Sequence, residues 1–276
     1  NASLVTVGQT HSCAALINGG VQCWGRSTDG QLGNGGSSTR TTPLAVAGVS
    51  GVSSVSSGAG HSCALLGSGS VQCWGYNFYG QLGIGNLANS SSPVTVPGIA
   101  NAISVAAGGQ HSCAVISGGT VQCWGNNTNG ELGNSSSTPS PSPVAVTGIT
   151  NAVSVAAGAN HTCAVLSTGA LRCWGYNFSG QLGNASTNNA FSPVAVTGIT
   201  TAASVSAGTS HTCAVLTGGS VICWGRNNNG ELGAGSTANS SLPVAAVGVV
   251  SASAVSAGNN HTCAVLRSGA VQCWGA

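Results

Sequence analysis

Residues 161–175 read His161-Thr162-Cys163-Ala164-Val165-Leu166-Ser167-Thr168-Gly169-Ala170-Leu171-Arg172-Cys173-Trp174-Gly175, and this stretch recurs six times along the chain. Its histidine stands at positions 11, 61, 111, 161, 211 and 261, so the period is fifty residues with no insertion. All twelve cysteines and all six tryptophans lie in these copies. Self-similarity at a fixed period of this length indicates a repeat architecture.

Each copy is predicted to form a β-hairpin. Short β-prone runs flank Ser167-Thr168-Gly169, and a three-residue hairpin loop favours glycine at its third position, where the backbone is left-handed. With this loop residues 166 and 170 pair, so Cys163 pairs with Cys173. Pair types alternate along an antiparallel ladder, which makes this a non-hydrogen-bonded pair with Cα atoms about 4.5–5.5 Å apart. That separation suits a disulfide.

Disulfides are therefore expected within all six hairpins, in preference to free buried thiols or a metal site. Metal ligation is the more specific of these two alternatives, because His161 shares a strand face with Cys163. A structural zinc site takes four ligands, whereas one hairpin offers one histidine and two cysteines. The expected disulfides are Cys13–Cys23, Cys63–Cys73, Cys113–Cys123, Cys163–Cys173, Cys213–Cys223 and Cys263–Cys273.

One period contains material for four strands. Residues 152–157 alternate as a first strand, the hairpin supplies two more, and Pro193-Val194-Ala195-Val196 makes a short fourth strand. Both hairpin faces are largely apolar, so each sheet should be covered on both sides. Four strands per repeat with no helical periodicity are typical of a propeller blade. The last repeat ends after its third strand, so its blade should lack a fourth.

The repeat resembles the RCC1 repeat. The residues that carry the resemblance are Gly158-x-x-His161-Thr162-Cys163-Ala164, Gly169 and Cys173-Trp174-Gly175-x-Asn177-x-x-Gly180-Gln181-Leu182-Gly183. The resemblance implies an all-β, six-bladed RCC1-like β-propeller that forms a single domain over residues 1–276. It also implies that the histidines bind backbone groups between neighbouring blades and that the tryptophans are apolar plugs there. The cysteine pairs suit secreted bacterial members of the family.

Composition excludes several function classes. Five arginines and three acids give a net charge of +2 without a basic stripe, so no nucleic-acid binding is expected. No apolar run reaches the length of a membrane-spanning helix. Paired cysteines indicate an oxidising compartment, and a first residue other than methionine fits a secreted chain after signal-peptide removal. Candidate glycosylation sites in exposed loops are Asn89, Asn134, Asn184 and Asn239.

Catalysis has little support in the sequence. Asp29, Glu131 and Glu231 fall in separate repeats, whereas acid–base chemistry by carboxylates needs two of them close together. No nucleophile elbow, calcium loop or phosphate loop is present. We therefore expect no enzyme activity, no cofactor and no metal.

The loops that follow each Trp-Gly differ between repeats and are the candidate binding surface. Tyrosine, arginine and asparagine are residues that binding surfaces favour. The alternative is that these aromatic side chains only pad the rim of the propeller. The candidate partner-binding residues are Arg26, Tyr76, Phe78, Tyr79, Tyr176, Phe178 and Arg226.

The expected function is that of a secreted, non-enzymatic structural or binding module, with self-assembly into an extracellular layer or fibre as the first hypothesis. An open blade edge and near-identical repeats favour it. The alternative is a protein-binding inhibitor or adhesin that uses the variable loops on one propeller face, or a glycan binder that uses the same aromatic residues. GTPase exchange does not suit the compartment.

Overall fold

A computed structural model describes all residues of the chain, 1–276, and contains 23 strands and no helix. No segment of it is a helix long and apolar enough to cross a membrane. The strands are β1 (Ala2–Val7), β2 (His11–Leu16), β3 (Val21–Gly25), β4 (Arg40–Ala45), β5 (Val52–Ser57), β6 (His61–Leu66), β7 (Val71–Gly75), β8 (Ser90–Thr95), β9 (Ala102–Ala107), β10 (His111–Ile116), β11 (Val121–Gly125), β12 (Ser140–Ala145), β13 (Ala152–Ala157), β14 (His161–Leu166), β15 (Leu171–Gly175), β16 (Ala190–Ala195), β17 (Ala202–Ala207), β18 (His211–Leu216), β19 (Val221–Gly225), β20 (Ser240–Ala245), β21 (Ala252–Ala257), β22 (His261–Leu266) and β23 (Val271–Gly275).

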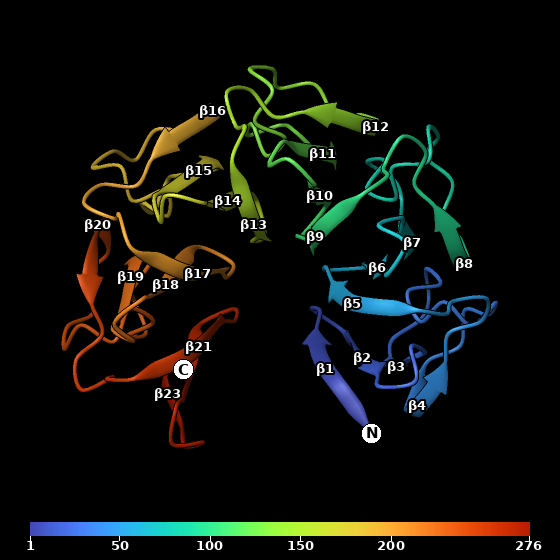
Figure 1. The fold of residues 1–276 in the computed structure, drawn as a ribbon, viewed down its shortest axis with the longest axis horizontal. Coiled ribbons are helices and arrows are strands. Elements are labelled where there is room, and N and C mark those ends of the chain that lie inside the picture. The colour runs from blue at the N-terminus through green and yellow to red at the C-terminus, as the bar shows by residue number, and fades with distance from the viewer. The chain divides into compact units, whose positions relative to one another are not determined.

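Consecutive strands form six antiparallel sheets, five of four strands and one of three. These six blades confirm the expected all-β, six-bladed propeller class with a repeat of about fifty residues. The blades fall into two compact units, residues 1–128 with 138–146 and residues 129–137 with 147–276. Within the first unit β1, β5 and β9 lie next to one another, as β13, β17 and β21 do within the second (Figure 1). That residues 1–276 form a single domain stays a prediction.

The hairpin register is the one that the sequence predicts. In blade 4, Val165 pairs with Leu171 and Cys163 with Cys173. The loop is closed by two bonds: the Leu166 N–H donates to the Ala170 carbonyl at 2.9 Å, and the Gly169 N–H donates to the Leu166 carbonyl at 2.8 Å. Gly169 has φ = +81°, a conformation that strains any residue with a Cβ.

All six expected disulfides are present, one in each blade, and no cysteine is free. The alternatives of free thiols and of metal ligation are therefore wrong. The paired Cα atoms lie 4.0–4.1 Å apart. This is slightly closer than the spacing expected of the strand pair, because the covalent bond holds the two backbones together.

The fourth strands begin earlier than the sequence predicts. In blade 4 this strand is β16, Ala190–Ala195, so Pro193 lies inside it and not at its start. The strand pairs with β15 on one side only, and its register shifts between the pairs Cys173–Val194 and Gly175–Ala190. Proline is tolerated at this position because the strand lies at an edge and the missing N–H is not needed by the ladder.

Each hairpin is covered on both faces in the interior of a unit, as expected. In blade 4 every residue of β14 is buried, and the tryptophans of blades 2 to 5 have no exposed surface. In the first unit, Trp124 of blade 3 packs against Leu82 and Val96 of blade 2. In the second unit, Trp224 occupies the same place against Leu182 and Val196. The tryptophans thus plug the junctions between blades.

The sixth blade differs from the others because its sheet ends at β23. Cys263 is half-buried and Cys273 is exposed, whereas none of the other ten cysteines has any exposed surface. Val271 is 60% exposed, although its equivalents are buried. The three-stranded blade therefore presents its disulfide to solvent.

We expect the Cys263–Cys273 disulfide to be reduced first. Thiol–disulfide exchange requires that the reductant reach a sulfur atom, and only this disulfide has an exposed cysteine. Limited treatment of the native protein with glutathione, followed by alkylation and peptide mass spectrometry, should show it opening at least about tenfold faster than the other five. Equal rates for all six would contradict the prediction.

Candidate functional site

The loops that follow each third strand are held by a buried asparagine. In blade 4 the Asn177 side chain has no exposed surface, and its Nδ2 group donates to the carbonyls of Ser186 and Asn188 at 2.9 Å each. Its Oδ1 atom accepts the Leu182 N–H at 2.9 Å. Its own N–H donates to the Oδ1 atom of Asn189 at 2.9 Å. One amide therefore ties the start of the loop to its far end.

The same device recurs in blades 2 and 5. Asn77 donates to the carbonyls of Asn86 and Ala88 and accepts the Leu82 N–H. Asn227 makes the equivalent bonds. Blade 1 has Ser27 in this place, with one bond to the Gly36 carbonyl at 3.3 Å.

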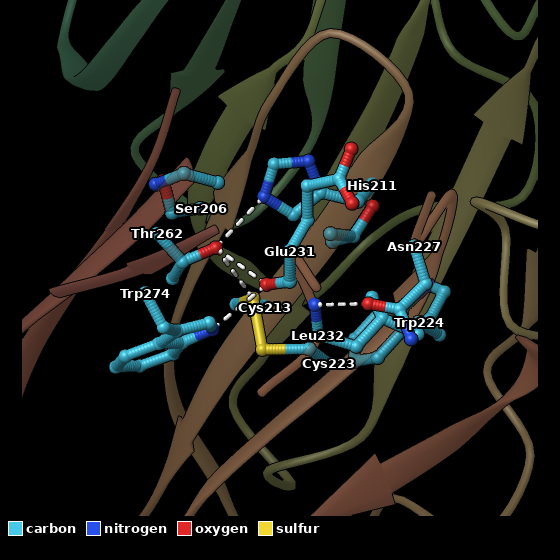
Figure 2. Close-up of a disulfide and its surroundings, with 12 residues drawn as sticks. Ser206, His211, Cys213, Cys223, Trp224, Asn227, Glu231, Leu232, Thr262 and Trp274 are labelled. Atoms are coloured by element: carbon cyan, nitrogen blue, oxygen red, sulfur yellow. Dashed lines mark hydrogen bonds between the residues drawn. A yellow bond between two sulfur atoms is a disulfide. The ribbon is translucent and has the colours of Figure 1, made fainter. Parts of the chain in front are cut away.

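A second residue, four positions further on, anchors each loop to the next blade. Figure 2 shows this for Glu231: its backbone carbonyl accepts the Trp274 Nε1–H at 2.8 Å and the Thr262 hydroxyl at 2.9 Å. The carbonyl of Gln181 accepts the equivalent bonds from Trp224 and Thr212. The loops are thus fixed at both ends.

The side chain of this Gln or Glu also accepts hydrogen bonds within its own loop. The Oε1 atom of Gln181 accepts the Ser179 N–H at 3.0 Å. Where the residue is Glu231, an asparagine precedes it by two positions: Glu231 accepts the Asn229 N–H at 2.8 Å and the Asn229 Nδ2–H at 3.4 Å. The carboxylates of Glu131 and Glu231 are buried, so these acids brace loops. No group of three or more His, Cys, Asp or Glu side chains able to hold a metal ion is present.

The histidines bind hydroxyl groups of the following blade, and the expectation that they bind backbone groups is wrong on this point. The hydrogen bonds run from Nε2 to a side-chain oxygen and measure 2.7–2.9 Å for the pairs His11–Ser62, His61–Ser112, His161–Thr212 and His211–Thr262. The serine or threonine stands next to the cysteine of its own strand, so the disulfide, the histidine and the hydroxyl share one junction (Figure 2).

Burial keeps these imidazoles neutral. Desolvation lowers the pKa of His61 to about 3, with smaller contributions from the charges of His11 and His111. Desolvation likewise lowers the pKa values of His11, His111 and His211 to about 4. The histidines therefore belong to the framework of the fold and not to a binding surface.

The fixed loops of blades 2 and 4 display aromatic rings. Tyr76 and Phe78 flank the buried Asn77, and their ring centroids lie 6.4 Å apart with an interplanar angle of 12°. Tyr79 meets Phe78 edge-on at 5.1 Å. Exposed fractions of 62% for Phe78 and 76% for Phe178 show that the rings face solvent. Both phenylalanine rings are therefore accessible to a partner, and their role in binding stays a prediction.

The structure groups the candidate residues by unit. In the first unit Tyr76, Phe78 and Tyr79 form one cluster. Burial raises the pKa of Tyr76, and the charges of Tyr79 and of Asp29 in the preceding blade raise it further. Arg26 of that same loop donates to Thr28 at 2.8 Å.

In the second unit Tyr176 and Phe178 form a similar pair at 6.5 Å. Arg226 binds the Asn260 side chain at 3.3 Å and lies 3.7 Å from Glu231. It is therefore partly used by the framework, whereas Arg26 is exposed.

The candidate glycosylation sites lie in the long loops that the buried asparagines hold. Asn89 and Asn239 are exposed, and Asn134 and Asn184 are half-buried. The Oδ1 atoms of Asn89 and Asn239 accept the N–H groups of Asn77 and Asn227. Their glycosylation stays a prediction.

The residues that sequence reasoning missed are the loop braces themselves. The motif Asn-x-x-Gly-[Gln/Glu]-Leu-Gly was used only as a sign of resemblance, although its asparagine and its Gln or Glu position the candidate binding loops. A signal for the pairing existed, because glutamate occurs only where asparagine stands two residues earlier, at Asn129-x-Glu131 and Asn229-x-Glu231.

The whole chain, residues 1–276, matches the family model described as "RCC1-like domain". Yeast RCC1 (Prp20), solved with Kap60, is 23% identical with a TM-score of 0.86 over 98% of this chain and 69% of that one. Human WBSCR16 is 22% identical with a TM-score of 0.88 over 100% of this chain and 77% of that one.

The WD40 ectodomain of the Arabidopsis thaliana receptor kinase ACR4 is 24% identical with a TM-score of 0.59 over 100% of this chain and 79% of that one. No curated protein sequence matches. The model match over the full length and the six disulfide-linked repeats agree, and the chain belongs to the RCC1-like domain family.

Proposed function

We propose that this chain is a secreted, non-enzymatic protein-binding module that recognises its partner through the aromatic loops of blades 2 and 4. The proposal rests on how these loops are held. The side chains of Asn77 and Asn177 are buried and hydrogen-bonded to the backbone of their loops, while Phe78 and Phe178, one residue away, are exposed. Rigid, exposed aromatic side chains supply contact area at low entropic cost, which is typical of binding surfaces.

Two further observations support the proposal. The six disulfides favour an oxidising, extracellular environment, because reducing compartments keep thiols free. Yeast RCC1 (Prp20), which has this fold, was solved bound to Kap60, and its binding to Gsp1p and histones has been described. We also propose that residues 1–276 of this chain form a single domain.

We expect photo-crosslinkers placed in the aromatic loops to capture the partner, and we expect this capture to be lost when the neighbouring tyrosines are replaced. Phe78 and Phe178 are replaced by a photo-crosslinking phenylalanine analogue, one at a time, and the protein is exposed to the secreted proteins of the producing cells. Crosslinking should capture a protein at each position, because each of these loops is held by its buried asparagine and exposes a phenylalanine ring. Replacing Tyr76, Tyr79 and Tyr176 with serine should lower the yield at least about tenfold, since a hot-spot aromatic contributes about 2 kcal/mol or more.

The matched control carries the analogue at Ile17, which is 71% exposed and lies in the turn after β2, outside the aromatic loops. Crosslinks of equal yield and identity at Ile17 would contradict the proposal. Binding of the loops to a glycan array, abolished by the same serine variant, would instead identify a glycan as the ligand.

Self-assembly is the second candidate function, and exposed apolar side chains favour it. Val7 of β1 is 72% exposed, Val5 is 55% exposed and Leu4 is 42% exposed, whereas Val55, the equivalent of Val5 in β5, is buried. Exposed apolar surface of this kind favours association. Sedimentation velocity over a wide concentration range should then reveal polymers that Val5→Asp with Val7→Asp abolishes, and a monomer at all concentrations would exclude this role.

A further inference from the structure

Asp29 carries the one carboxylate side chain of this protein that solvent can reach. The chain has three acidic side chains, and Glu131 and Glu231 have no exposed surface. Asp29 is half-buried, and the Thr28 hydroxyl donates to its Oδ2 atom at 3.1 Å. No ion pair of the structure includes Asp29. Its negative charge is therefore accessible and has no cation paired to it.

Arg26 lies in the same loop but does not pair with Asp29. Its Nε–H group donates at 2.8 Å to the Thr28 hydroxyl, which in turn donates to the Asp29 carboxylate. The Asp29 N–H donates to the Oε1 atom of Gln31 at 2.9 Å, which fixes the backbone at this position. The carboxylate is therefore held in place, while its Oδ1 atom accepts no hydrogen bond from the protein.

This loop packs against the strand end that carries the aromatic cluster of blade 2. The Trp74 Nε1–H donates to the Gln31 carbonyl at 3.0 Å, and a Cβ added at Gly75 would lie 3.1 Å from the Cα of Gln31. Tyr76 follows Gly75, and Asp29 stands two residues before that glutamine. Burial is the largest cause that raises the pKa of Tyr76, and the charge of Asp29 raises it further. The carboxylate of blade 1 therefore lies beside the rings of blade 2.

The aromatic cluster supplies ring faces that attract a cation. The rings of Tyr76 and Phe78 are nearly parallel, with an interplanar angle of 12°, and Tyr79 meets Phe78 edge-on. The face of an aromatic ring carries a negative partial charge, so it attracts lysine and, more often, arginine side chains. Phe78 is 62% exposed. Its loop is fixed by the buried Asn77 and by the Tyr79 N–H, which donates to Gln81 at 3.0 Å.

The similar aromatic pair in blade 4 lacks both the accessible carboxylate and the third ring. Blade 4 has Ser179 in place of the third aromatic residue, and the loop of blade 3 before it has Asn129 in place of the aspartate. The Glu131 carboxylate of that loop is buried and accepts the N–H and Nδ2–H groups of Asn129. Tyr176 and Phe178 therefore offer rings without an accessible negative charge, and they form an internal control.

We propose that the carboxylate of Asp29 and the rings of Tyr76, Phe78 and Tyr79 form a site for an arginine side chain of the protein partner. This inference deepens the proposed function and rests on it. The guanidinium group stacks on a ring face and donates N–H groups to the Asp29 carboxylate, because its planar fork matches a carboxylate. Lysine carries a compact and strongly hydrated charge without a planar group to stack, so the site favours arginine.

The test uses the three tyrosines of the chain, all replaced by 3-fluorotyrosine, as probes in fluorine NMR. Tyr76 and Tyr79 report on the site, Tyr176 is the internal control, and single Tyr→Phe variants assign the three signals. Titration with N-acetyl-arginine amide should shift the Tyr76 and Tyr79 signals saturably and leave the Tyr176 signal in place. N-acetyl-citrulline amide, which has a similar shape but no charge, should shift none of them.

Matched variants locate the site. Asp29→Asn keeps the shape of the side chain and removes its charge, so the dissociation constant of the arginine derivative should rise at least about threefold. Phe78→Leu should raise it by a similar factor, whereas Phe178→Leu, at the equivalent exposed position of blade 4, should leave it unchanged. The proposal is overturned by the absence of saturable shifts or by a dissociation constant that survives Asp29→Asn. Equal binding of the citrulline derivative or of N-acetyl-lysine amide also overturns it.

This inference and the proposed function fail separately. Binding of the arginine derivative is measured without any partner protein, so its absence removes the arginine site and leaves partner capture by the aromatic loops intact. If the arginine derivative binds but the photo-crosslinkers capture no protein, the proposed function is wrong and the chemistry of the site stands.

Discussion

Lowering the pH from 7 to 4 is expected to destabilise this protein strongly, with the loss set by its buried histidines. Burial lowers the folded-state pKa of His61 to about 3 and those of His11, His111 and His211 to about 4. In the unfolded chain they titrate near 6.5. As the pH falls below 6.5 the unfolded state therefore binds protons that the folded state does not, and stability is lost until the pH reaches the folded pKa values.

The expected magnitude is large. Each of these histidines should reduce the free energy of unfolding by about 1.4 kcal/mol per pH unit within this window. Together the four amount to the order of 10 kcal/mol by pH 4, which is comparable with the stability of a whole domain. Urea unfolding at a series of pH values, with the disulfides intact, measures the slope.

Substituting one buried histidine tests whether these residues cause the loss of stability at low pH. His61→Gln keeps a hydrogen-bonding group for Ser112 but cannot gain a proton, so the slope between pH 6 and pH 4 should fall by about 1.4 kcal/mol per pH unit. His261→Gln is the matched control, because His261 is exposed. An unchanged slope in His61→Gln would show that the buried histidines do not cause the acid sensitivity.

Removing a disulfide is expected to cost more in an interior blade than in the last one. Cys63 and Cys73 are both fully buried in the core between blades 2 and 3, whereas Cys273 is exposed. Both bonds join cysteines ten residues apart, so the chain-entropy contribution is the same, about 2–3 kcal/mol. Cys63→Ala with Cys73→Ala also leaves a cavity, which adds about 1–2 kcal/mol.

The two double variants form a matched pair. Because loop length is constant, the difference between their free energies of unfolding reports packing alone. Chemical denaturation of Cys63→Ala/Cys73→Ala and of Cys263→Ala/Cys273→Ala should show the interior variant as the less stable. Equal losses would mean that the sulfur atoms contribute nothing to the packing between blades.

The hairpins and their disulfides could be predicted from the sequence because both follow from local rules. A three-residue loop closed by Gly169 fixes the register, and the register places Cys163 opposite Cys173. The number of blades follows from the period. The expectation that each sheet is covered on both sides also comes from one repeat alone, since Ala164 and Val165 are both apolar and lie on opposite faces.

The junctions could not be predicted in the same detail because their contacts join different repeats. The partner of His61 is Ser112, 51 residues away, and a serine beside a cysteine carries no signal of that role. The start of the fourth strand lies at Ala190, before Pro193, and proline does not mark it because an edge strand accepts proline within its length. Asn177 was seen only as a motif residue, because its bonds go to backbone carbonyls that no side-chain pattern reveals.

The hydroxyl, indole and carbonyl contacts between blades occur at fixed offsets in sequence: 51 residues from histidine to hydroxyl and 43 from tryptophan to the loop carbonyl. Any blade can therefore follow any other without a new interface. Unequal recombination within the gene, which adds or deletes a whole repeat in frame, would keep every such contact intact. A gain or loss of one whole repeat therefore leaves the hydrogen-bond partners at every remaining junction unchanged.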